Sequence, residues 1–144
     1  MGRILSIDYG QKRVGFAVTD ELQICACALE TVHVSQAFDY VKNYINKEKV
    51  DTIVVGEPKT LNNTHSDAAR FIEPFVNRLK KEIKNIEIVR FDERFTSKMA
   101  FQTLVDAGVN KKTRANKALL DKISATIILQ SYLQHKELML NNEF

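Results

Sequence analysis

The chain has 144 residues, of which 44% are hydrophobic and 27% are charged, and its formal net charge is +3. These values are typical of one globular domain, and no apolar run approaches the roughly 20 residues that span a bilayer. The sequence shows no N-terminal secretory pattern, so we expect a cytoplasmic protein without a membrane partner. A net charge of this size permits nucleic acid binding but does not by itself favour it.

The first predicted elements are two antiparallel strands joined by a tight turn, between Ile4 and Asp20. Apolar residues lead up to Asp8, and beyond Gly10 they alternate with small residues as far as Val18. We expect Gly10 to adopt a positive φ, which lets the chain turn back directly after Asp8. Asp8 is then a carboxylate at the end of a buried strand, where burial is costly unless the group is paired or binds a metal.

A third strand over residues 24–32 completes an antiparallel meander and contains both cysteines. Cys25 and Cys27 are two residues apart, so we expect them on one strand face as small buried side chains in a reducing compartment. Zinc would require further ligands at metal spacing, and the three histidines lie far apart in the sequence. An amphipathic helix follows, with Ser35 as its N-cap, and runs to about Glu48.

The second half of the chain alternates strands and helices. Residues 51–56 form a continuous apolar run, which is typical of a parallel strand buried on both faces. A helix capped by Ser66 has one apolar stripe, and Pro74 within it predicts a kink or a restart. A fifth strand over residues 86–91 follows this helix.

Two further helices are predicted after the fifth strand, from Thr96 to about Ala107 and from Asn116 to about Lys136. We expect residues 138–144 to be a frayed tail, so that residues 1–137 form the single domain. The order of elements predicts an α/β fold with one mixed five-stranded sheet. Three of its strands are antiparallel, the next two are parallel, and helices cover both faces.

Three acidic residues occupy positions that meet at one edge of such a sheet. Asp8 ends the first strand, Glu93 follows the fifth strand, and Asp121 lies about one turn into the last helix. Taken singly, each could be a surface charge or a cap. Together, three carboxylates would repel one another without a cation, and their hard oxygens suit Mg²⁺ or Mn²⁺. We therefore predict a site for one or two such ions, which can activate a water to cleave a phosphodiester.

Basic residues lie close to these acids in the sequence and are candidates for phosphate contacts. They are Lys12, Arg13, Arg94, Lys111, Lys112 and Arg114. Arg94 could instead form an ion pair with an acid such as Asp92, and the cations of residues 109–116 could be a solvated surface.

Four motifs in order and at matching spacing make the chain similar to a known family. They are Asp8-Tyr9-Gly10-Gln11-Lys12-Arg13-Val14-Gly15, Val55-Gly56-Glu57-Pro58, Asp92-Glu93-Arg94-Phe95-Thr96-Ser97 and Asp121-Lys122-Ile123-Ser124-Ala125. Over about residues 4–132 the chain resembles the YqgF family, the pre-16S ribosomal RNA nucleases also called Holliday-junction-resolvase-like proteins. Asn63 and Met99 depart from the usual glycine and the frequent glutamate of the family, and neither is one of the three acids.

The resemblance implies a ribonuclease H-like fold with an acidic site that depends on a divalent metal. By motif position it implies that Asp8, Glu93 and Asp121 are the catalytic and metal-binding residues. It also implies a role in ribosome biogenesis, through maturation of the 5′ end of 16S ribosomal RNA. The expected activity is thus that of a hydrolase, a metal-dependent endonuclease acting on precursor 16S ribosomal RNA, free or in the ribosome.

Two other functions stay open at this point. One is a Holliday junction resolvase acting on four-way DNA, for which a two-fold homodimer would suit the symmetric substrate. Whether the protein is a monomer or a homodimer stays open. The other is a non-catalytic RNA-binding factor in ribosome assembly. Sugar-kinase, heat-shock and actin-like ATPases also begin with Asp-x-Gly on a hairpin, but they need two such domains to enclose ATP.

Overall fold

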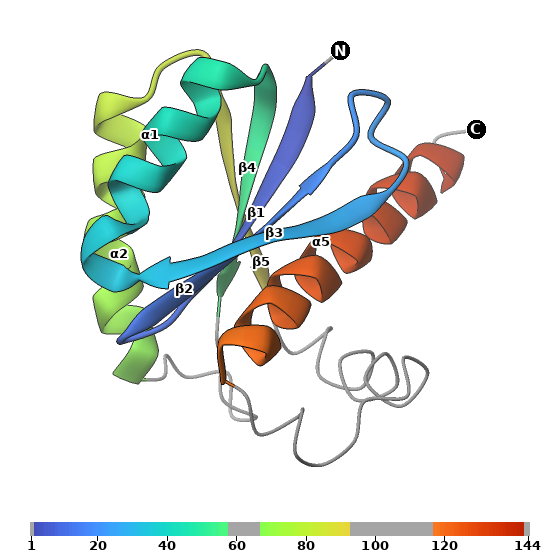
Figure 1. Ribbon diagram of the computed structural model, residues 1–144. Coiled ribbons are helices and arrows are strands. Elements are labelled where there is room, and N and C mark those ends of the chain that lie inside the picture. The colour runs from blue at the N-terminus through green and yellow to red at the C-terminus, as the bar shows by residue number, and fades with distance from the viewer. Residues whose placement is uncertain (1, 58–66, 93–116, 143–144) are drawn as a thin grey trace.

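The structure is a computed structural model that describes residues 2–57, 67–92 and 117–142 (Figure 1). For residues 67–70, 117–122 and 140–142 it describes only the backbone. The strands are β1 (Arg3–Tyr9), β2 (Arg13–Thr19), β3 (Ala26–His33), β4 (Val50–Glu57) and β5 (Glu87–Asp92). The helices are η1 (Val34–Gln36), α1 (Ala37–Lys47), α2 (Asp67–Glu82) and α5 (Lys117–Asn142).

The strands form one five-stranded sheet in the order β3-β2-β1-β4-β5. β1 pairs antiparallel with β2, which pairs antiparallel with β3, whereas β1 and β4, and β4 and β5, are parallel. Figure 1 shows α1 and α2 on one face of the sheet and α5 across the other. The predicted mixed sheet with helices on both faces is confirmed.

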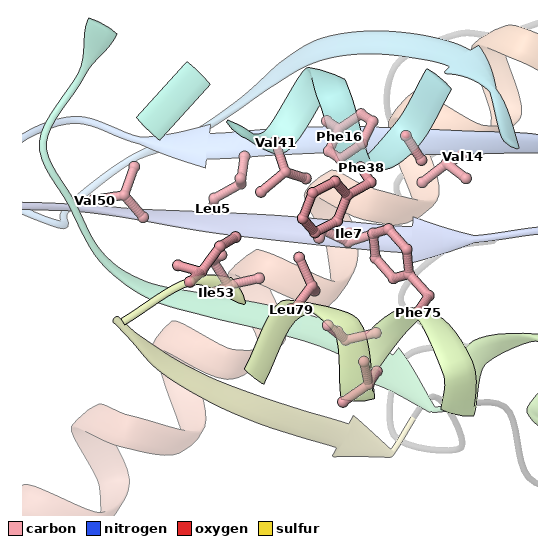
Figure 2. Packing of buried hydrophobic residues seen from close by; sticks show 14 of the residues in the cluster. Leu5, Ile7, Val14, Phe16, Phe38, Val41, Val50, Ile53, Phe75 and Leu79 are labelled. Carbon is pink, nitrogen blue, oxygen red and sulfur yellow. The ribbon is translucent and has the colours of Figure 1, made fainter. Parts of the chain in front are cut away.

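Alternation along the strands divides the core into two clusters. Leu5 and Ile7 of β1 face α1 and α2, where Figure 2 shows them among the aromatic and aliphatic side chains of those helices. Ile4 faces α5 and packs in a smaller cluster with α5 residues such as Ile128. Because successive side chains of a strand point to opposite faces, Ser6 and Asp8 share the α5 face with Ile4.

Helix α2 is continuous through Pro74, so the predicted restart does not occur. The apolar stripe explains how the helix tolerates a proline that removes one backbone hydrogen bond. Four residues on either side of Pro74 are buried against the sheet. They are Ile72 before it and Phe75, Val76 and Leu79 after it. The predicted Ser66 cap and the predicted helix from Thr96 to Ala107 lie outside the described residues.

The start of α1 differs from the prediction, because Ser35 is not its N-cap. Ser35 lies in the 3₁₀ turn η1, and His33 caps that turn: its Nδ1 accepts a hydrogen bond from the Ser35 amide at 3.1 Å. The Ser35 hydroxyl lies 2.8 Å from the same nitrogen, so it is engaged with the ring rather than with an α-helical amide.

The prediction that both cysteines are buried is also wrong, because Cys25 and Cys27 are exposed free thiols. Cys25 precedes β3, and its amide bonds the carboxylate of Asp20 in the preceding turn. Cys27 lies on β3 itself, but β3 is an edge strand, and burial at an edge depends on how far the helices reach across the sheet.

Helix α5 continues to Asn142, past its predicted end near Lys136. Glutamate, leucine and methionine, which follow Lys136, are good helix formers, so local preference favours the extension. Leu138 and Met139 are exposed there. The domain boundary at residue 137 stays a prediction. Within the described ranges, no helix has both the length and the apolar character that a membrane crossing requires.

Candidate active site at the strand ends

Asp8 is half-buried one residue before the end of β1, and its neighbours on the sheet are small. In the antiparallel register Asp8 lies opposite Gly15 of β2. On the other side Ile7 pairs with Val55 of β4, so the same register continued by one residue brings Gly56 beside Asp8. Glycine has no side chain, and neither neighbouring strand therefore covers the Asp8 carboxylate at this level of the α5 face.

The turn after Asp8 requires glycine at position 10 because of a close backbone contact, and not because of a positive φ. The Gly10 amide donates a 2.9 Å hydrogen bond to the carbonyl oxygen of Arg13, which closes the hairpin. The φ of Gly10 lies outside the left-handed region, so the expected positive φ is wrong. A Cβ at this position would lie 2.6 Å from the Arg13 oxygen, and this clash excludes any side chain.

Two predicted phosphate contacts, Lys12 and Arg13, belong to this hairpin. Lys12 is exposed at its tip, and its carbonyl accepts a 2.9 Å hydrogen bond from the amide of Val34. Arg13 is half-buried as the first residue of β2. The hairpin therefore holds two cations within a few residues of Asp8 at the same end of the sheet.

Two sets of hydrogen bonds fix the direction in which α5 crosses the sheet. The buried hydroxyl of Ser6 donates to the carbonyl oxygen of Ala125 at 2.8 Å. Near the other end of the helix, the Lys136 ammonium donates to Gln23, whose amide nitrogen donates to the carbonyl oxygen of Gly2. Helix α5 therefore runs antiparallel to β1.

The backbone of Asp121 thus lies in the first turns of α5, one turn before Ala125 and toward the end of β1 that bears Asp8. Figure 1 shows α5 beginning at the sheet edge where β1, β4 and β5 end. Ser6 was not among the residues predicted to form or position the site. The signal was visible, because Ser6 is the polar residue that interrupts the apolar run of the first strand.

At the end of β5 the two faces of the sheet have different roles. Phe91 packs on the α5 face, where its ring meets Tyr132 edge to face at 6.3 Å between centroids. Arg90 points to the opposite face and bridges two acids, Glu73 at 2.8 Å and Glu57 at 3.9 Å. Glu57, the acid of the Val-Gly-Glu-Pro motif, is therefore on the face opposite to Asp8.

Tyr9 follows Asp8 directly and faces the α2 side, where its ring lies 4.7 Å from that of Phe75. Burial raises the pKa of the Tyr9 phenol above its usual value, so the group stays neutral at physiological pH. Asp8 and Tyr9 thus occupy the two faces of the same strand end.

Several predicted site residues cannot be placed. Glu93, Arg94, Lys111, Lys112 and Arg114 lie outside the described residues, and only the backbone of Asp121 is described. Among the side chains that the structure describes, no three histidine, cysteine, aspartate or glutamate groups lie close enough together to hold a metal ion. The three-acid metal site, which needs Glu93 and Asp121, therefore stays a prediction.

Comparison with known sequences gives near-complete matches. A protein of Phocaeicola vulgatus is 56% identical over 137 residues, which is 95% of this chain and 99% of that protein. A protein of Flavobacterium johnsoniae is 53% identical over 136 residues, 94% of this chain and 99% of that protein. Both bear the name "Putative pre-16S rRNA nuclease".

Solved structures support the fold. Thermus thermophilus RuvC aligns over 93% of this chain and 96% of its own, with a TM-score of 0.57 and 11% identity. The same protein in complex with a Holliday junction substrate gives a TM-score of 0.56. The family model described as "RuvX: Holliday junction resolvase" matches residues 2–135. The chain therefore belongs to the RuvX Holliday junction resolvase family, and through it to the hydrolytic nucleases.

Proposed function

We propose that this protein is a metal-dependent endonuclease that cleaves precursor 16S ribosomal RNA in the cytoplasm, with Asp8, Glu93 and Asp121 as its catalytic acids. One observation carries the proposal. Asp8 lies on the α5 face at the carboxyl ends of the strands, and α5 begins at this same edge with Asp121 in its first turns. The names of the relatives described above give the substrate.

The third acid, Glu93, follows the last residue of β5 in the sequence. Phe91, two positions earlier, faces α5 as Asp8 does. Continued alternation would direct residue 93 to that same face, which is the reason to group it with the other two acids.

Carboxylate oxygens from Asp8, Glu93 and Asp121 are a suitable donor set for Mg²⁺ or Mn²⁺, because these hard cations prefer oxygen ligands. A bound ion would lower the pKa of a water and stabilise the leaving oxygen of the phosphodiester. The protein's own part is positional. The Gly10 hairpin fixes the end of β1, and the hydrogen bond from Ser6 holds α5 against it.

Cations near this edge would hold the RNA backbone. Lys12 and Arg13 belong to the hairpin beside Asp8, while Arg94 follows Glu93, and Lys111, Lys112 and Arg114 precede α5 in the sequence. Arginine and lysine contacts to phosphates position a nucleic acid without reading its sequence. Recognition of the precursor end would then depend on the shape of the RNA or of the ribosomal particle.

The decisive experiment incubates the protein with a precursor 16S ribosomal RNA fragment, an unrelated linear RNA and a four-way DNA junction. Each substrate is tested with Mg²⁺, with Mn²⁺ and with chelator. We expect cleavage of the precursor fragment with either ion and none with chelator.

Two outcomes would overturn the proposal. Cleavage of the junction alone would favour the resolvase activity, which the family description makes the second candidate. Tight RNA binding without cleavage under any condition would favour a ribosome-assembly factor instead.

A further inference from the structure

A groove lined by aromatic side chains opens between α1 and α2, on the sheet face opposite to Asp8. Its volume is about 280 Å³, and its lining includes Tyr9, Phe38, Phe71, Phe75 and Arg78. The groove lies at the end of β1, because Tyr9 is one of its lining residues. Tyr9 directly follows Asp8 in the sequence. The groove and Asp8 therefore lie at the same end of β1, on opposite faces of the sheet.

One ring of the groove is open to solvent. Phe71 is 51% exposed, whereas Phe75 and Phe38, at 7% and 6%, belong to the core. Phe38 and Phe75 both belong to the core cluster that Figure 2 shows. The buried rings form a rigid floor, and Phe71 presents a free aromatic face above the surface.

Two basic residues lie at the groove, Arg78 in its lining as an ion pair with Glu82, and Lys12 nearby. The guanidinium carbon of Arg78 lies 3.8 Å from the centre of the Phe38 ring, and its Nε donates to Glu82 at 2.7 Å. These two contacts fix the guanidinium at the rim. Lys12 lies on the adjoining side, because its carbonyl is bonded to the amide of Val34, another lining residue. None of the described residues that line the groove is acidic.

We propose that this groove binds one unpaired base of the nucleic acid substrate, stacked on Phe71, with Arg78 and Lys12 directed to the neighbouring phosphates. The inference rests on the proposed function, since it assumes a nucleic acid substrate. Aromatic rings beside cations are the usual means of binding single strands without sequence preference. A base within a duplex is already stacked and cannot enter, so the groove selects single-stranded segments next to the cleavage site.

The test uses a short single-stranded RNA with 2-aminopurine at one position, titrated in chelator so that no cleavage occurs. The chain contains no tryptophan, so the fluorescence of the probe has no tryptophan background. The variants are Phe71→Ala and Phe71→Tyr. The matched control is Ile24→Ala, which removes an apolar side chain that is 68% exposed elsewhere on the surface.

We expect binding to quench the probe in the wild type, in Phe71→Tyr and in Ile24→Ala. Phe71→Ala should lose the quenching and bind the single strand roughly 5-fold to 150-fold more weakly, the range of one stacked base. Its affinity for a duplex RNA of the same sequence should be unchanged. An unchanged melting temperature of Phe71→Ala would confirm that the fold is intact.

Equal single-strand affinity of Phe71→Ala and the wild type would overturn the inference, and so would an equal loss on the duplex. A wild type that binds and quenches but never cleaves precursor RNA would refute the nuclease proposal and leave the groove assignment standing. A wild type that cleaves while Phe71→Ala binds normally would refute only the groove.

Discussion

The side chain of Ser6 and the backbone of Ala125 are joined by a 2.8 Å hydrogen bond across the α5 face of the sheet. Both residues are fully buried, so the bond is shielded from water. It sets how far along β1 the helix lies, and thereby which residue of α5 comes next to Asp8. The relationship connects the two ends of the sequence, because β1 begins the chain and α5 ends it.

This bond predicts two graded effects at Ser6. Ser6→Ala removes one buried hydrogen bond and should lower the free energy of unfolding by about 1 kcal/mol, measured by urea denaturation. Ser6→Leu adds volume where α5 packs on β1, which should cost about 1–3 kcal/mol and displace the helix start. Cleavage by Ser6→Leu, assayed well below its melting temperature, should fall much further than cleavage by Ser6→Ala.

The exposed Asn46 of α1 provides the control, since Asn46→Ala should affect neither cleavage nor stability to the same extent. If Ser6→Leu cleaves RNA as fast as the wild type does, the position of α5 on β1 does not matter for activity.

The second prediction concerns Asp8→Asn. The amide is nearly the same size as the carboxylate but has no negative charge, so the ion would lose a ligand. Cleavage should be abolished, while RNA binding should be retained or become tighter because one charge that repels phosphate is removed. Single-turnover cleavage and a filter-binding titration would measure the two effects separately. Undiminished cleavage by Asp8→Asn would exclude this carboxylate from the mechanism.

Much of the fold could be predicted because its local patterns and its packing agree. In β1 Leu5 and Ile7 alternate with polar Ser6 and Asp8, and this pattern already assigns the two pairs to opposite faces. The uninterrupted apolar run of β4 identified a strand covered on both sides, and the structure places it between β1 and β5. The position of Asp8 at a strand end was predicted from the apolar residues before it and the glycine turn after it.

The predictions were wrong where contacts that the local sequence pattern does not report decide the burial or the backbone conformation of a residue. Burial of Cys27 depends on whether a helix reaches the edge strand β3, which strand periodicity does not report. The cap at Ser35 was displaced by a neighbouring histidine ring, whose Nδ1 accepts the amide hydrogen bond instead. At Gly10 the turn was foreseen, but its cause is a steric contact with the Arg13 carbonyl, and such a contact is visible only in three dimensions.

The third prediction follows from the Asp20 turn. Hydrogen bonds from the amides of Cys25 and Ile24 hold the pKa of Asp20 below its usual value of 3.8. Since the folded-state pKa is the lower one, the carboxylate stabilises the fold above the unfolded-state pKa, and this contribution is lost as the pH falls through the folded-state value. Asp20→Ala should therefore melt below the wild type at pH 7, and the difference should shrink between pH 4 and pH 2.

Melting temperatures of both proteins over that pH range provide the measurement. Asp20→Asn should be intermediate at pH 7, because its amide oxygen still accepts hydrogen bonds but carries no charge. A difference between Asp20→Ala and the wild type that stays constant down to pH 2 would show that the charge has no part in the turn.

The last prediction concerns the basic segment that precedes α5 in the sequence. We expect Lys111, Lys112 and Arg114 to neutralise phosphates of the bound RNA, because α5 begins at the edge of the sheet where Asp8 lies. Each phosphate contact contributes somewhat under one unit to the slope of log affinity against log salt. Replacing all three with glutamine should flatten that slope by roughly two units and raise the RNA concentration needed for cleavage. Turnover at saturating RNA should change little, since the proposed metal ligands are untouched.

A matched control removes three cations from the opposite edge of the sheet. Lys47, Lys49 and Lys84 are exposed and lie near the amino ends of β4 and β5, away from Asp8. Their triple glutamine variant has the same net charge as the first, so a general charge effect would flatten both slopes equally. We expect the slope of this control to match that of the wild type. If the two triple variants behave alike, the basic segment makes no specific phosphate contact, and the RNA must approach the acids from another side.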